Sequence, residues 1–292
     1  MKVGVIIPNA GSKATVENIQ TTSKWAKELG YHSLWLTDHV VLAEEVNALY
    51  PYRSHGRWDY SPDTIWTDPL LTLAWAGQYA PGLQLGTSVL VFPIRNPILL
   101  AKQIASLDFL SGGRVIMGVG VGWMEEEFDI IGEKFQGRGR RTEEMVALMR
   151  QLWTGEEVEF NGEYYQVPSC RMHPASVQDS IPIVWGGHSD ISIERAARVG
   201  DGWHPTQITI EQLSDGLKKL RNHCERYERD FDSLTIIARP GDIYDIDEES
   251  HARHQAMGVS HMVVDTPIHE SDPQLSLVRA KMERVADICG LR

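Results

Sequence analysis

Residues 83–119 read LQLGTSVLVFPIRNPILLAKQIASLDFLSGGRVIMGV and contain three successive patterns. Leu83–Phe92 and Arg114–Val119 are short, mostly apolar runs, which predict buried strands. Between them, Pro97–Leu110 predicts a helix, because proline stands at its start and Ser111-Gly112-Gly113 closes it. Two apolar strands joined by a helix predict a parallel sheet that is covered by helices.

The same alternation recurs along the rest of the chain. Further strands are predicted at Val3–Ile7, Ser33–Leu36, Ile181–Trp185, Asp201–His204, Leu234–Ala238 and Val259–Val264. Further helices are predicted at Ser12–Gly30, Asp68–Ala80, Thr142–Trp153, Ile191–Val199, Ile210–Tyr227 and Leu275–Ile288. The eight strands, nearly all followed by a helix, predict the α/β class and a single (β/α)8 TIM barrel over residues 1–292.

Two inserts interrupt this alternation. Residues 37–67 follow the second strand and residues 120–141 follow the fourth, with a hairpin predicted at Val158–Val167 and its turn at Asn161-Gly162. Both inserts leave the carboxyl ends of strands, which is the face where barrel enzymes carry their active sites. We therefore expect the inserts to be lids or binding loops.

Composition limits the classes of partner. The chain has 28 Lys and Arg against 40 Asp and Glu, and its net charge of −12 argues against nucleic acid or an anionic membrane as a partner. The start of the chain has too short an apolar run for a signal peptide, and no stretch is apolar enough for a membrane helix. The three cysteines lie far apart and predict a reducing cytoplasm, and His251 and His254 lack a third ligand, so no metal is expected.

A histidine stands directly after the second strand. In the run Thr37-Asp38-His39, the imidazole is expected to point into the barrel mouth. Imidazole titrates near neutral pH, so His39 can move a proton at working pH. Asp38 is the neighbouring carboxylate that we expect to orient it. The alternative interpretation is a structural hydrogen bond at a strand end.

Two glycine-containing segments follow other strands. Gly118-Val119-Gly120-Val121-Gly122 has GxGxG spacing rather than GxGxxG, so it favours a loop that lines a cofactor over a dinucleotide motif. Gly186-Gly187-His188-Ser189 opens a helix and, with Thr206, predicts a phosphate cradle. Ser189 equally suits a helix cap.

Charged and aromatic residues gather in the inserts. Glu125-Glu126-Glu127 is interpreted as a solvated helix start. Arg138, Arg140 and Arg141 can either grip a ligand or pair with these glutamates. Trp58 and Trp66 are the tryptophans most expected to meet a substrate, in an aromatic pocket to which Arg53, His55 and Arg57 lend cationic character.

Five stretches together resemble one family. They are Leu34–His39, Arg95–Lys102, Leu107–Arg114, Gly118–Trp123 and Gly200–Trp203. The chain resembles the bacterial luciferase-like flavin monooxygenases and, among them, the deazaflavin (coenzyme F420)-dependent oxidoreductases. The resemblance covers residues 1 to about 205, and the block from Arg95 to Arg114 is its most specific part.

This resemblance implies a site. The cofactor ring would lie across the barrel mouth, with His39 against the ring or the substrate. A bulge with a non-prolyl cis peptide at Ser88–Val89 would support the ring, and Gly120, Val121 and Gly122 would flank it. The cofactor phosphate would meet Gly186, Gly187, His188, Ser189 and Thr206.

One position departs from the family pattern. Some sugar-phosphate deazaflavin dehydrogenases carry a glutamate where this chain has Trp123, and their phosphate-binding lysine has no clear match here. Trp123 therefore joins Trp58 and Trp66 in a predicted substrate pocket that is more apolar.

The expected function is an oxidoreductase that transfers hydride between F420 and a small organic substrate. An FMN-dependent monooxygenase that uses O2, a nicotinamide-dependent reductase on a doubly wound sheet and a non-catalytic flavoprotein are the alternatives. The family resemblance also predicts a homodimer through helices near the second and third strands.

Overall fold

Every predicted strand is present, and the parallel strands close into a barrel. The computed structural model describes residues 1–52, 56–241, 246–266 and 275–292. The strands are β1 (Lys2–Ile6), β2 (Ser33–Leu36), β3 (Gln84–Thr87), β4 (Leu90–Val91), β5 (Val115–Gly120), β6 (Val158–Asn161), β7 (Gln166–Cys170), β8 (Ile183–Gly186), β9 (Gly202–His204), β10 (Thr206–Ile208), β11 (Thr235–Pro240) and β12 (His261–Val264).

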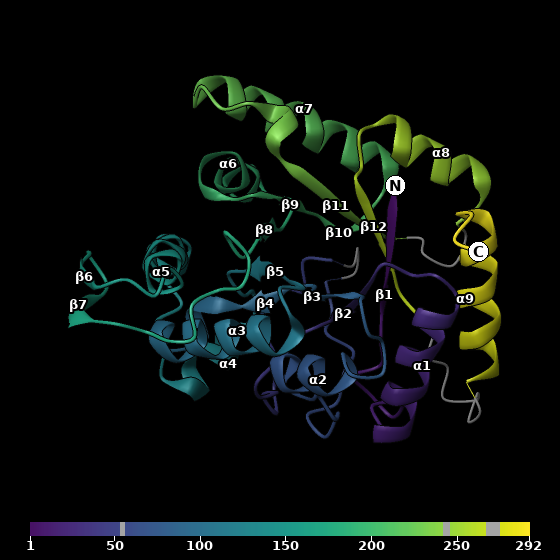
Figure 1. Cartoon of the computed structure of the whole chain (residues 1–292), viewed down its shortest axis with the longest axis horizontal. Coiled ribbons are helices and arrows are strands. Elements are labelled where there is room, and N and C mark those ends of the chain that lie inside the picture. The colour runs from purple at the N-terminus through teal and green to yellow at the C-terminus, as the bar shows by residue number, and fades with distance from the viewer. Residues whose placement is uncertain (53–55, 242–245, 267–274) are drawn as a thin grey trace.

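Parallel pairing runs once around the barrel. It leads from β1 through β2, β3, β5, β8, β9, β11 and β12, and β12 pairs with β1 again (Figure 1). The predicted (β/α)8 barrel is therefore confirmed. Because the sheet closes, the chain has no doubly wound sheet of the kind that the nicotinamide alternative requires.

Helices cover the outside of the barrel in Figure 1. They are α1 (Val16–Glu28), α2 (Pro69–Ala76), α3 (Pro97–Ser111), α4 (Glu125–Ile131), α5 (Arg138–Leu152), α6 (Asp190–Val199), α7 (Ile210–Arg226), α8 (Glu248–Ala256) and α9 (Ser276–Ile288). Local sequence sets their ends: Asn96 caps α3 by accepting from two backbone N–H groups, Pro97 follows it, and Gly112 ends the helix with a positive φ of 71°.

The inserts differ in detail from the prediction. Helix α5 starts at Arg138, one turn before the predicted Thr142, and α8 was not expected because its sequence is polar. The hairpin of β6 and β7 pairs Asn161 with Gln166, so its turn is longer than the predicted Asn161-Gly162. Glu144 of α5 explains the longer turn, since its carboxylate accepts from three consecutive backbone N–H groups there.

Trp35 fills the centre of the barrel. Its side chain is fully buried and packs with the inward-facing apolar residues of the other strands. Gly4 and Gly86 make room for the indole, because a Cβ at either position would lie 2.4 Å from a ring atom of Trp35. The bulky side chain of one strand is thus matched by glycine on both neighbouring strands.

Two buried histidines accompany Trp35. Trp35 Nε1 donates to Ser33 Oγ at 2.7 Å, and Ser33 Oγ lies 2.7 Å from His261 Nε2. His204 Nδ1 donates to the Ile237 carbonyl at 2.7 Å. Burial lowers the pKa of His261 to about 3 and the pKa of His204 to about 4, so both rings are neutral in the folded protein at neutral pH.

The free energy of unfolding is expected to fall below pH 6.5. The unfolded chain takes up protons on His204 and His261 below their ordinary pKa, whereas the folded protein does not until the lowered values, so acid favours unfolding. Between pH 6.5 and 5, the lowered pKa of each histidine reduces the free energy of unfolding by about 2 kcal/mol. Urea unfolding across this range measures the slope, and His261→Gln should flatten it; an unchanged slope in that variant contradicts the assignment.

The outer faces of α2 and α3 expose several large apolar side chains. Leu71, Leu99 and Leu110 are 73%, 66% and 76% exposed. These helices adjoin the second and third strands, and the homodimer through them stays a prediction. None of the helices among the described residues is long and apolar enough to span a bilayer.

Candidate active site

A cavity of about 1180 Å³ opens at the carboxyl ends of the barrel strands. Residues that follow successive strands line it, among them Asn9, His39, Val89, Gly122 and His188. Both inserts add further lining residues. The cavity thus occupies the face where barrel enzymes carry out chemistry.

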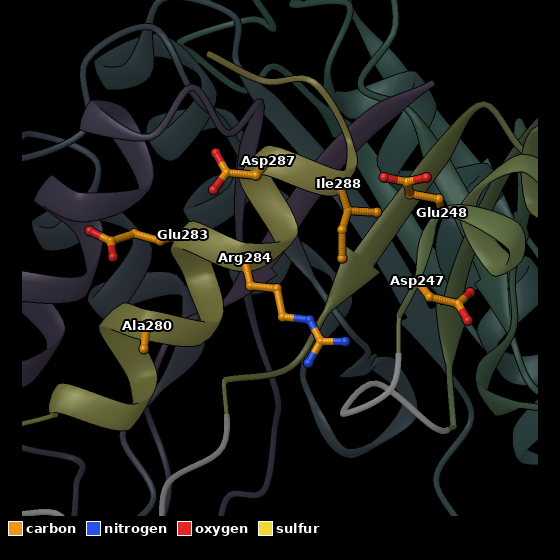
Figure 2. Close-up of a pocket in the computed structure, with 7 residues that line it drawn as sticks. All are labelled: Asp247, Glu248, Ala280, Glu283, Arg284, Asp287 and Ile288. Carbon is orange, nitrogen blue, oxygen red and sulfur yellow. The ribbon is translucent and has the colours of Figure 1, made fainter.

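A second hollow of about 550 Å³ lies between α8 and α9 (Figure 2). It is lined by Asp247 and Glu248 at the start of α8 and by residues 280–288 of α9. Figure 2 shows Arg284 extending from α9 among four carboxylates. No predicted site residue lies there, and the hollow is outside the barrel mouth. It is therefore not a candidate active site.

His39 is paired with a carboxylate from the other insert. His39 Nδ1 lies 3.0 Å from Glu127 Oε2, and both side chains are buried. Glu127 Oε1 accepts from the backbone N–H of Val40 at 2.7 Å and of Val41 at 3.4 Å. An ionised carboxylate only accepts, so Nδ1 donates to Glu127 and Nε2, on the opposite edge of the ring, is left as the basic nitrogen.

Asp38 does not orient His39. Its carboxylate accepts from both terminal nitrogens of Arg95 at 2.7 and 2.8 Å and from the backbone N–H of Val91 at 2.8 Å. Burial raises the pKa of Asp38, and the Arg95 guanidinium acts against this rise. Asp38 and His39 therefore face different partners, Arg95 and Glu127. The expectation that Asp38 orients His39 is therefore wrong, and Glu127 has that position.

Val89 forms the floor of the cavity. The Ser88–Val89 peptide bond is cis, as the resemblance implied. A Cβ at Gly120 would lie 2.5 Å from one Val89 methyl group, and a Cβ at Gly186 would lie 2.8 Å from the other. Glycines on β5 and β8 therefore allow Val89 to sit between these two strands.

Ser88 hydrogen bonds below this floor. Ser88 Oγ lies 2.8 Å from His204 Nε2, and His204 Nδ1 already donates to a carbonyl. Because His204 is neutral, its Nε2 accepts, and the Ser88 hydroxyl donates to it. Arg239 donates to the Ser88 carbonyl and hydroxyl oxygens and pairs with Asp265 at 2.5 Å. Ser88 therefore lines the cavity with its hydroxyl proton already used.

One side of the cavity is suited to an anion. Ser189 caps α6, and the N-terminus of α5 has no side-chain cap. Arg195 and Arg138 line the cavity beside these helix starts. Burial and the nearby Arg195 guanidinium lower the pKa of Arg138. Arg195 Nε in turn pairs with Glu143 Oε1 at 2.7 Å. Helix N-termini and guanidinium groups both favour phosphate or carboxylate ligands.

His188 and Thr206 complete the predicted cradle. Both line the cavity, and the Tyr52 hydroxyl hydrogen bonds to Thr206 while its ring packs 5.4 Å from the His188 ring. Burial lowers the pKa of His188. The structure thus brings Gly186, Gly187, His188, Ser189 and Thr206 to one side of the cavity.

Aromatic rings surround His39 on the other side. The rings of Trp58, Trp66 and Trp123 lie 4.9, 4.8 and 6.2 Å from the His39 ring, centroid to centroid. Together with Tyr50 and Tyr60 they form what we term the aromatic wall. Arg53 and His55, expected to add cationic character, lie outside the described residues. Substrate contact by the aromatic wall stays a prediction.

Some site residues were missed by sequence reasoning. Glu127 was interpreted as solvated, but it is only 2% exposed and holds His39; Glu125 alone of the three glutamates is exposed. Arg141 is buried and pairs with Glu133, so it does not reach the cavity as a ligand group. Arg195 is not among the predicted site residues, although it lies in the helix that Ser189 caps.

Comparisons with known proteins come from sequence and structure. A family model for luciferase-like monooxygenase matches residues 1–284. An uncharacterized protein of Mycobacterium tuberculosis is 38% identical over 207 residues, which cover 69% of this chain and 70% of that protein. An F420-dependent glucose-6-phosphate dehydrogenase of Amycolatopsis mediterranei is 30% identical over 236 residues, which cover 77% of this chain and 64% of that enzyme.

Solved structures share the fold. An F420-dependent secondary alcohol dehydrogenase in complex with an F420-acetone adduct has a TM-score of 0.78 at 16% identity, covering 99% of this chain and 98% of that chain. The oxygenating constituent of 3,6-diketocamphane monooxygenase of Pseudomonas putida, in complex with FMN, has a TM-score of 0.75 at 13% identity with the same coverage. The chain therefore belongs to the luciferase-like monooxygenase family of oxidoreductases, which includes F420-dependent and FMN-dependent members.

Proposed function

We propose that this protein is an F420-dependent oxidoreductase that transfers hydride to or from a small alcohol or ketone. The observation that carries the proposal is the buried His39–Glu127 pair at the edge of the large cavity. When bound, the cofactor supplies the hydride acceptor or donor. The protein supplies the proton transfer, the orientation of both ligands and the exclusion of water.

His39 moves the proton. In the oxidative direction, Nε2 accepts the proton of the substrate hydroxyl. The carbon that bears this hydroxyl gives up its hydrogen as a hydride to the cofactor. In the reductive direction, Nε2–H returns the proton to the carbonyl oxygen. Glu127 holds the required tautomer and stabilises the imidazolium that forms, because its carboxylate lies 3.0 Å from Nδ1.

The remaining cavity residues fit a flavin-like cofactor. Val89 offers an apolar floor between two glycines for a flat ring, and the α6 start at Ser189 suits a phosphate. FMN ends at its phosphate, whereas F420 continues into a chain that bears carboxylates. Arg138 and Arg195 beside the phosphate cradle match these further negative charges, and this favours F420 over FMN.

Cofactor titration tests the proposal. We expect the cofactor-free protein to bind F420 more tightly than FMN, as measured by fluorescence. Arg195→Ala should weaken F420 binding about tenfold or more, because a charge-assisted contact is lost. Arg198→Ala is the matched control, since Arg198 also pairs with Glu143 but does not line the cavity. Tighter binding of FMN supports the monooxygenase alternative, and binding of neither cofactor refutes the proposal.

A further inference from the structure

The aromatic wall is a continuous apolar surface centred on Trp58. The Trp58 ring lies 4.8 Å from Tyr60, 5.2 Å from Trp123, 5.3 Å from Tyr50 and 6.0 Å from Trp66, centroid to centroid. Rings at these separations pack against one another. The wall is therefore formed before any substrate arrives, and it adjoins the imidazole that moves the proton.

Glu126 fixes this wall in place. Its Oε1 accepts from the backbone N–H of Asn47 at 2.7 Å and of Ala48 at 3.1 Å, just before Tyr50. Partial burial raises the pKa of Glu126, but backbone N–H groups, including those of Asn47 and Ala48, lower it below its usual value. The adjacent Glu125 is exposed, and its carboxylate accepts a hydrogen bond from Gln136 Nε2 at 3.1 Å. Holding the wall in advance reduces the entropy lost on binding.

The charges of the cavity are divided between its sides. Among the described lining residues, the arginines and lysines are Arg138, Arg195 and Arg239, and none belongs to the aromatic wall. Arg138, the first residue of α5, donates to the Gly122 carbonyl at 3.0 Å. Arg195, in the middle of α6, pairs with Glu143, and Arg239 pairs with Asp265 beside the floor. An anionic substrate would therefore lose its hydration beside the wall without gaining a cation from the described residues of the wall.

Among the described residues that line the cavity, no carboxylate beside the wall is both buried and free to pair with a cationic substrate. Glu127 is occupied by His39 and two backbone N–H groups, and Asp38 is occupied by Arg95. Asp59 and Asp63 line the cavity but are exposed to solvent. A buried ion needs a paired, hydrogen-bonded partner to offset its desolvation.

We propose that the aromatic wall selects an uncharged, largely apolar ketone or alcohol, such as a substituted cyclic one, and discriminates against phosphorylated or carboxylated substrates. This inference rests on the proposed function for the reaction at His39. The inference concerns the wall alone. The free energy that favours the neutral substrate comes from apolar surface that is removed from water when it binds.

Three ketones of similar shape test the charge preference. They are 4-methylcyclohexanone, the anion 4-oxocyclohexanecarboxylate and the fixed cation 1,1-dimethyl-4-oxopiperidinium. Calorimetric titration uses protein saturated with oxidised cofactor, because a ketone and an oxidised cofactor do not react. We expect the dissociation constant of the neutral ketone to be lower than that of either ion by a factor of about ten or more. Tighter binding of the anion or the cation, equal binding of all three, or binding of none overturns the inference.

Two neighbouring variants test the role of Glu126. Glu126→Ala should weaken binding of the neutral ketone about fivefold, because two hydrogen bonds to the wall segment are lost, while cofactor affinity is unchanged. Glu126→Gln, whose amide oxygen still accepts, should restore most of the affinity, and Glu125→Ala should bind as the wild type does. Equal loss in Glu125→Ala and Glu126→Ala contradicts the role of Glu126.

Failure of the proposed function gives a different result. If neither F420 nor FMN binds, the proposed function has failed, and the three ketones are then titrated into the free protein. A neutral preference there still supports the wall assignment. If a cofactor binds and either charged ketone binds more tightly than the neutral one, only the inference about substrate class has failed.

Discussion

His39→Ala is expected to lower kcat about a hundredfold to ten-thousandfold, the range for loss of a positioned general base. The reason is that Nε2 is the nitrogen left basic once Nδ1 donates to Glu127. Binding of the cofactor should stay close to that of the wild type, since His39 is not among the residues of the predicted phosphate cradle. The measurement is the rate of F420 reduction at saturating alcohol, with the alcohol that the wild type oxidises fastest.

A loss of kcat without a loss of folding or of cofactor affinity separates a catalytic histidine from a structural one. Circular dichroism and cofactor affinity check that the variant is folded. If the kcat of His39→Ala matches that of the wild type, another group moves the proton.

Glu127→Gln is expected to reduce kcat by a similar factor, about a hundredfold to ten-thousandfold, through the wrong tautomer of His39. The side-chain oxygen of the glutamine can still accept the hydrogen bond from the backbone N–H of Val40. The side-chain NH₂ group of the glutamine then faces His39 Nδ1. That NH₂ group donates, so Nδ1 must accept and the proton moves to Nε2. The imidazole is then protonated where an alcohol substrate needs a base.

Glu125→Gln is the matched control for this variant. Glu125 stands two positions earlier on α4 and is exposed, so its loss removes one charge from the same helix without touching His39. We expect wild-type kcat for Glu125→Gln, with unchanged substrate KM in both variants. A Glu127→Gln protein with wild-type kcat refutes the role of the carboxylate.

The barrel could be predicted because its determinants are local. Strands such as Val115–Gly120 are short apolar runs, and helix ends such as Asn96-Pro97 and Gly112 follow rules that act within a few residues. Prediction was weaker at the inserts. The start of α5 was placed one turn late because Gly137 provides no side-chain cap.

The partner of His39 could not be predicted, because the pairing is long-range. His39 and Glu127 are 88 residues apart, and the three consecutive glutamates look alike in the sequence. Their different surroundings arise only when α4 packs against residues 40–48. Asp38, adjacent in sequence, was the natural but wrong choice, because Arg95 and the backbone N–H of Val91 occupy its carboxylate.

Several residues of the family-like stretches have structural roles in the fold. Arg95 holds Asp38, and Asp108 accepts from the backbone N–H of Val177. These stretches therefore predicted the family and the barrel more directly than they predicted the proton-transfer residues. The aromatic residues of the first insert carry no such motif.

The contact between α4 and residues 39–48 has a consequence for protein engineering. Exchanging the first insert with that of a relative, while keeping residues 120–131, would separate the imidazole from its carboxylate and the loop amides from theirs. The two segments depend on each other, so a chimera that retains turnover has to take both from the same parent protein.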